Sequence, residues 1–139
     1  MKIILDAMGG DNAPDANIKG AINAINKVKA EIILVGKEDV IRSKIKEFYG
    51  KEMEEISDRL KIRNATETIE MEDQPTIAIK HKKDSSMVVG FNMLKQDDGD
   101  VFISAGNSGA LLAGATLLVG RIKGIDRPAL AGILPAYKS

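Results

Sequence analysis

The sequence predicts an α/β fold, a three-layer α/β/α sandwich built on a mainly parallel sheet. Short apolar runs at residues 2–5, 31–35 and 101–103 are typical of buried strands. Stretches with apolar residues at helical spacing separate these runs, and glycine-rich turns follow the first and the last. Strands that alternate with helices favour right-handed crossovers within one sheet. With 139 residues and no repeat or linker, the chain is expected to form one α/β domain over 1–139.

The first strand leads into a helix through the turn Met8-Gly9-Gly10-Asp11-Asn12. Asp6 stands at the end of the strand, and Pro14 suits the first position of the helix. We expect Asp11 or Asn12 to cap this helix. Its inward face should comprise Ile18, Ala21, Ile22, Ile25 and Val28.

The middle of the chain carries a second strand and a second helix. Residues 31–35 form a continuous apolar run, as expected for a strand covered on both faces. A helix is predicted over 38–49, with Gly50 as its stop. The segment 51–72 has no clear period and yields only a short strand near 60–63. Val40, Ile41, Ile45 and Phe48 should face inward from the helix.

Two helices precede the strand at 101–103. Pro75 opens a helical stretch that runs into the basic cluster 80–83, which contains the single histidine, His81. Ser85 or Ser86 is expected to cap the next helix. The apolar face of that helix should comprise Met87, Val88, Phe91 and Leu94.

The last part of the sequence predicts one more helix and one more strand. The apolar stretch from Gly109 to Gly120 is read as a buried helix, because it is too short to span a bilayer. After a loop, Arg127-Pro128 introduces the apolar run 129–134, which is expected to form a strand.

Composition excludes several classes of function. Basic and acidic residues number 20 each and aromatic residues make up 4%, which argues against nucleic acid as a partner. The absence of cysteine rules out disulfides and thiolate catalysis, and one histidine is too few for a histidine-rich metal site. We therefore expect no metal and no cofactor. The absence of cysteine fits a reducing cytoplasm, and the first apolar run is too short for a signal-peptide core.

Two turns are candidates for a binding site, residues 6–12 and residues 104–109. Both follow strands, and ligands of parallel sheets bind at the carboxyl ends of the strands. A helix should begin within Gly106-Asn107-Ser108-Gly109, where unpaired N–H groups favour an anion, phosphate first. The spacing matches neither a Walker loop nor the dinucleotide fingerprint. A tight turn with Ser108 as the helix N-cap therefore remains an open alternative.

Four segments resemble one family, the PlsX family of phosphate acyltransferases. They are Asp6-Ala-Met-Gly-Gly-Asp-Asn-Ala-Pro14, Lys82-Lys-Asp-Ser-Ser-Met87, Ser104-Ala-Gly-Asn-Ser-Gly-Ala110 and Gly124-Ile-Asp-Arg-Pro-Ala129. The resemblance implies an enzyme that transfers a fatty acyl group from acyl carrier protein to inorganic phosphate, giving acyl phosphate for phospholipid synthesis. It also implies a fold related to isopropylmalate dehydrogenases and phosphotransacetylases. It further implies a cytoplasmic homodimer that associates peripherally with the membrane.

The chain departs from this family in two respects. Many relatives carry His where this chain has Asn12, so a proton-transfer role cannot be carried over to this position. Members of the family are also much longer, so the chain is expected to be an amino-terminal part. It lacks later motifs of the active-site cleft and the part proposed to touch the membrane, and alone it is expected to be inactive.

The candidate site residues fall into three groups. Asp6 is expected to brace the first turn, whereas Asp11 is read first as a helix cap. Arg127 is either an anion clamp or a partner of Asp126 or Asp100 in a surface ion pair. The lysines at 80, 82 and 83 face the active-site anion, dock the acidic carrier protein or form a solvated face. The candidates are Asn12 and Asn107 as catalytic residues; Gly9, Gly10, Gly106, Ser108, Gly109, Arg127, Lys82 and Lys83 as substrate-binding residues; and Asp6, Asp11 and Ser104 as residues that shape the site.

Two other functions stay open at this stage. A non-catalytic phosphate- or nucleotide-binding module could use the same two turns. A phosphotransacetylase that uses coenzyme A is the alternative among enzymes.

Overall fold

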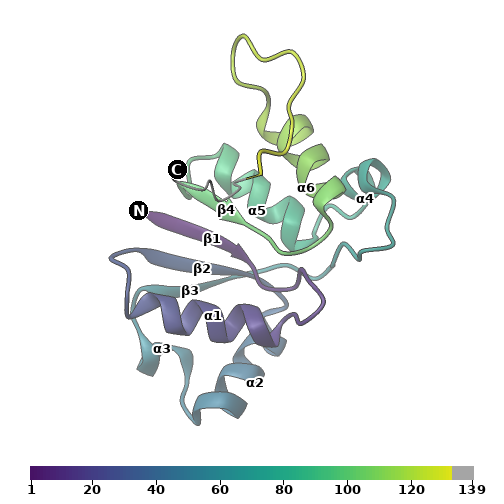
Figure 1. The fold of residues 1–139 in the computed structure, drawn as a ribbon. Coiled ribbons are helices and arrows are strands. Elements are labelled where there is room, and N and C mark those ends of the chain that lie inside the picture. Colours follow the sequence, from purple (N-terminus) through teal and green to yellow (C-terminus); the bar gives the residue numbers. More distant parts are fainter. Residues whose placement is uncertain (133–139) are drawn as a thin grey trace, which may run out of the picture.

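Four parallel strands form one sheet at the centre of the described part of the chain (Figure 1). The computed structural model describes residues 1–132. The strand order is β3-β2-β1-β4, so the parallel sheet expected from the sequence is confirmed. The strands are β1 (Lys2–Asp6), β2 (Glu31–Gly36), β3 (Leu60–Asn64) and β4 (Val101–Ile103).

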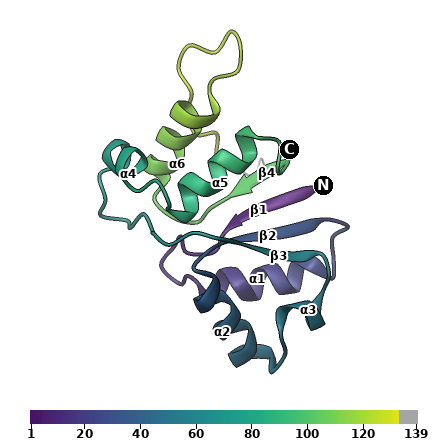
Figure 2. The same cartoon turned by 180° about the vertical axis from the view of Figure 1, so that it is seen from behind.

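Helices cover both faces of this sheet, which confirms the predicted α/β sandwich. One face carries α1, α2 and α3, and the other carries α4, α5 and α6; the view from behind shows the same division (Figure 2). At its end α6 passes into η1, where Gly120 N donates to Ala115 O, five residues earlier. The helices are α1 (Asp15–Ile25), α2 (Glu38–Tyr49), α3 (Met53–Ile56), α4 (Pro75–His81), α5 (Ser86–Lys95), α6 (Ser108–Gly114) and η1 (Ala115–Val119).

The alternation of side chains along β1 divides the core between the two faces. Ile3 and Leu5 pack with the α1 and α2 cluster, while the fully buried Ile4 packs with the cluster under α5. Gly90 lets α5 approach the sheet closely, because a Cβ at this position would lie 2.3 Å from Cε2 of Phe102. The two apolar clusters fix β1 as a central strand, buried on both sides.

Several details of the first half differ from the sequence-based expectation. Neither Asp11 nor Asn12 caps α1: the N-cap is Pro14, without a side-chain hydrogen bond, and Asn12 contributes its backbone carbonyl to Ala16 N. Val28 lies beyond the end of α1 and is 37% exposed, because the helix stops at Ile25. The short helix α3 was not predicted, since four residues show no period. Gly50 ends α2 in the left-handed conformation, as expected.

The second half shows similar shifts. Ser85 caps α5 as expected, by accepting from Val88 N. The cap of α6 is Asn107 rather than Ser108. The end of the apolar helix is not buried, since Leu117 is 52% exposed within the described part of the chain. Val101 and Ile103 are also exposed, because β4 is an edge strand of the described sheet.

The strand expected over residues 129–134 is not formed where the structure describes it. Residues 129–132 are exposed and have no regular structure, since no described strand pairs with the outer side of β4. Residues 133 and 134 lie outside the described part. No helix within residues 1–132 is long and apolar enough to cross a membrane.

Candidate functional site

The sheet changes its direction of growth between β1 and β4. From β1 the chain adds β2 and then β3 on one side, whereas β4 joins the other side of β1. Ligands of open parallel sheets bind outside the carboxyl ends of the strands at such a point. Two turns begin there, which we call the first glycine turn (residues 6–12) and the second glycine turn (residues 104–109).

The two glycine turns touch through their backbones. A Cβ at Gly9 would lie 3.0 Å from Gly106 N, and a Cβ at Gly106 would lie 3.2 Å from Gly9 Cα. Gly10 has a φ of 111° and faces Ala105, whose carbonyl oxygen would be 3.1 Å from an added Cβ. Side chains at these glycines would therefore push the turns apart.

The carboxylate of Asp6 ties the two turns together. It is 1% exposed, and its Oδ1 accepts from Met8 N at 3.0 Å and from Gly9 N at 3.1 Å. Its Oδ2 accepts from Ser104 Oγ at 2.7 Å, and the same hydroxyl accepts from Gly106 N at 3.1 Å. One buried side chain of the first turn thus organises N–H groups of both turns.

Asn17 of α1 also holds the first glycine turn, through the carbonyl oxygens of that turn. Its Nδ2 donates to the carbonyls of Asp6, Ala7 and Gly9, at 3.1, 3.2 and 2.9 Å. This role has no signal in the sequence, because an isolated asparagine on a helix has no distinctive spacing.

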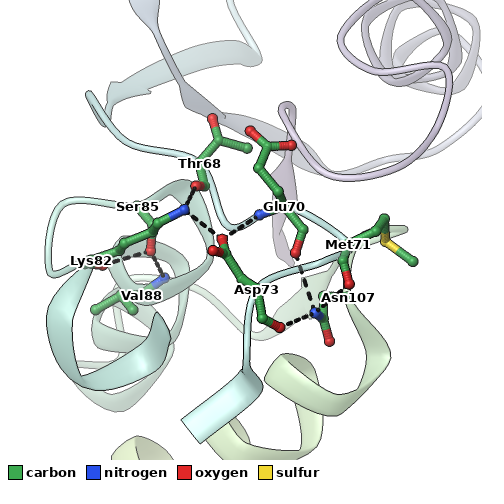
Figure 3. A network of polar contacts seen from close by, with 8 residues as sticks. All are labelled: Thr68, Glu70, Met71, Asp73, Lys82, Ser85, Val88 and Asn107. Carbon is green, nitrogen blue, oxygen red and sulfur yellow. Dashed lines mark hydrogen bonds and ion pairs between the residues drawn. The ribbon is translucent and has the colours of Figure 1, made fainter. Parts of the chain in front are cut away.

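Asn107 caps α6 and also holds the loop before α4; Figure 3 shows its contacts with that loop. Its Oδ1 accepts from Ala110 N at 2.9 Å, which caps the helix. Its Nδ2 donates to the carbonyls of Glu70, Met71 and Asp73 at 3.1–3.2 Å. Asn107 is 6% exposed, so its polar atoms are engaged in holding the loop before α4 against α6.

Lys82 stabilises the same loop (Figure 3). Its ammonium group pairs with the Asp73 carboxylate and donates to Thr68 O at 2.9 Å. The hydrogen bond from Lys82, and then that from Glu70 N, holds the pKa of Asp73 below its ordinary value. Sequence reasoning placed Lys82 among substrate-binding residues and missed Asp73, whereas the structure joins them in one ion pair.

A cavity of about 440 Å³ opens beside the first glycine turn. Gly10, Asp11 and Lys37 line one side, and the loop at residues 68–72 lines the other. A larger hollow, of about 600 Å³, includes Lys2 and Arg59 but lies at the amino ends of the strands. The smaller cavity is the better candidate, because it adjoins the carboxyl ends of β1 and β2.

Other candidate residues lie away from the contact between the turns. Asn12 is exposed and lines a separate hollow with Lys19 and Lys44. Lys83 and Arg127 are exposed, and Arg127 pairs with neither Asp100 nor Asp126 within residues 1–132. In the same range, no group of three His, Asp or Glu side chains is placed to hold a metal ion.

The ion pair between Lys82 and Asp73 makes stability depend on pH. A lowered carboxyl pKa stabilises the fold above the ordinary pKa and loses this contribution as pH falls through the lowered value. Lys82→Met should therefore reduce the free energy of unfolding by about 1 kcal/mol at pH 7, and by less at pH 3. Urea unfolding at both pH values measures this, with Lys83→Met, an exposed neighbour, as the control. An equal loss in both variants, or a loss independent of pH, would contradict the assignment.

Comparison with known proteins bears out the resemblance. A family model described as "Fatty acid synthesis protein" matches residues 1–139. Phosphate acyltransferases from Acetivibrio thermocellus and Clostridioides difficile are 53% and 51% identical to the chain over 136 and 138 residues. These matches cover 97% and 99% of the chain, and the chain spans 39% of each relative's length. The chain therefore belongs to the fatty acid synthesis protein family, alongside the phosphate acyltransferases that it resembles.

Proposed function

We propose that the protein to which this chain belongs transfers a fatty acyl group from acyl carrier protein to inorganic phosphate, giving acyl phosphate for phospholipid synthesis. Support comes from the family and from relatives named phosphate acyltransferase. The chain spans 39% of the length of those relatives. The proposed activity is therefore that of the whole protein. Residues 1–139 supply one part of its site.

The proposal rests on the backbone N–H groups at the start of α6, where the two glycine turns meet. Gly106 N is already bonded to Ser104 Oγ, and Ala110 N to Asn107 Oδ1. The N–H groups of Asn107, Ser108 and Gly109 form no hydrogen bond within residues 1–132. These three N–H groups, with the exposed hydroxyl of Ser108, are the proposed phosphate ligands.

The proposed reaction needs positioning more than covalent catalysis. An oxygen of hydrogen phosphate attacks the thioester carbonyl, the new C–O bond forms and the C–S bond breaks; the proton that the phosphate gives up passes to the carrier's sulfur, which leaves as a thiol. Phosphate is itself the nucleophile, so the chain's lack of cysteine removes nothing that the reaction requires. In this scheme Asn107 positions the start of α6, and Asn12 offers a hydrogen-bonding amide at the end of the first turn.

The first and the second glycine turn differ in the charges around them. The cavity beside the first turn is lined by three acidic residues, Asp11, Glu70 and Glu72, and by one lysine, Lys37, so its excess of carboxylates disfavours an anion. Phosphate is therefore assigned to the second turn. Lys80 and Lys83 are exposed, and no ion pair involves them in the described part of the chain; they are the proposed docking residues for the acidic carrier protein.

Assembly and location belong to the same proposal. We assign the whole protein to the cytoplasm as a homodimer that associates peripherally with the membrane through a part outside this chain. Arg127 remains a proposed anion clamp.

Turnover and phosphate binding can be tested together in the full-length protein. The full-length protein should form acyl phosphate from long-chain acyl carrier protein and inorganic phosphate, as measured by hydroxamate trapping. Ser108→Ala should raise the KM for phosphate by about five- to tenfold, because one direct hydrogen bond is lost. Ser43→Ala, which changes an exposed serine on α2, is the matched control and should leave the KM unchanged.

Three other outcomes separate the alternatives. Phosphate binding without turnover favours a non-catalytic binding module. Turnover of acyl coenzyme A in preference to the carrier-protein thioester favours a phosphotransacetylase. An unchanged KM in Ser108→Ala rejects the assignment of phosphate to the second turn.

Docking of the carrier protein can be tested by reversing the charges of two lysines. The double reversal Lys80→Glu with Lys83→Glu should slow association of acyl carrier protein and weaken its dependence on salt, with phosphate saturation unchanged. The matched control reverses Lys27 and Lys29, exposed lysines in the loop between α1 and β2. Stopped-flow association rates at several salt concentrations measure the effect. Equal slowing in both double variants would point to net charge rather than to a docking surface.

A further inference from the structure

Three carbonyl oxygens at the end of β1 converge on one side chain. Asn17 Nδ2 lies 3.1 Å from Asp6 O, 3.2 Å from Ala7 O and 2.9 Å from Gly9 O. An amide nitrogen carries two hydrogens, so these carbonyls share them. The first glycine turn is thereby held from α1 through acceptors, while Asp6 holds it through the donors of Met8 and Gly9.

This arrangement determines which backbone groups face the second turn. Asn17 belongs to α1, which covers the face of the sheet opposite to α6 (Figure 1). The carbonyls bonded to Asn17 are therefore directed toward the α1 face. The Cα of Gly9, with no side chain, is what meets Gly106.

The electrostatic consequence concerns the proposed phosphate ligands. A carbonyl oxygen carries partial negative charge and repels an anion, whereas an N–H group attracts it. Carbonyls released from Asn17 would be free to turn toward the second glycine turn. Asn107 acts in the same way, because its Nδ2 donates to three carbonyls of the loop at residues 70–73.

We propose that Asn17 is a positioning residue of the site: by binding the carbonyls of Asp6, Ala7 and Gly9, it keeps acceptor groups away from the anion at the second glycine turn. This inference rests on the proposed binding of phosphate there. Asn17 touches no substrate in this account and acts through the first turn.

The test is a graded series in the full-length protein. Asn17→Ser keeps one donor and Asn17→Ala keeps none, while Asn23→Ala changes an exposed asparagine of the same helix that forms no side-chain hydrogen bond within residues 1–132. Inorganic phosphate is titrated into each variant by calorimetry. We expect the Kd to rise from wild type through Asn17→Ser to Asn17→Ala, by about tenfold in total, with Asn23→Ala unchanged.

The same titration separates positioning from a merely structural role. A residue needed only for folding would lower the stoichiometry, because fewer molecules are folded, and would leave the Kd unchanged. If Asn17→Ala does not fold, Asn17→Ser still gives the decisive comparison. Phosphate affinity equal to that of wild type in Asn17→Ser and in a folded Asn17→Ala overturns the inference.

Failure of the proposed function gives a different result. If the wild-type protein binds phosphate but forms no acyl phosphate, the transferase is refuted. If the Kd for phosphate still rises through Asn17→Ser to Asn17→Ala, the inference about Asn17 is supported. Wild-type protein that binds no phosphate overturns both.

Discussion

The buried carboxylate of Asp6 is the contact on which the site depends. It joins groups 98 residues apart in the chain when it accepts from Ser104 Oγ, and it accepts two N–H groups of its own turn. Hydrogen bonds to a charged group contribute about 1.5–3 kcal/mol, and leaving buried donors without a partner costs a similar amount. The two glycine turns therefore have one favoured arrangement, in which Gly9 lies against Gly106.

The fold brings this contact about through the placement of one strand. β1 is central and its carboxyl end leads to the first turn, while β4 returns beside it after three strands and five helices have formed along the chain. The asparagines at 17 and 107 then fix the surrounding carbonyls from opposite faces. Within residues 1–132, backbone N–H groups at the start of α6 form no hydrogen bond, which is the property that an anion site requires.

The sequence was sufficient for β1 to β4 and the long helices, because continuous apolar runs and helical spacing depend on burial that the chain encodes locally. The apolar run after Pro128 misled the prediction of a strand, because residues 129–132 have no strand to pair with in the described sheet. It also located both glycine turns. It did not identify Asn107 as the cap of α6, or its hold on a loop 34 residues earlier, because that role depends on tertiary contact. Asn17 and Asp73 were missed for the same reason. The cap expected from Asp11 was wrong, since the chain enters α1 at Pro14 without a side-chain cap.

The most direct test is a double-mutant cycle on the link between the turns, with phosphate affinity of the full-length protein as the readout. Asp6→Ala and Ser104→Ala each remove one partner of the hydrogen bond from Ser104 Oγ to Asp6 Oδ2. If this bond couples the turns into one site, the double variant should bind phosphate about as weakly as either single variant. The coupling energy should then be about 1 kcal/mol or more. Additive losses would show that the two turns act independently and would contradict the account.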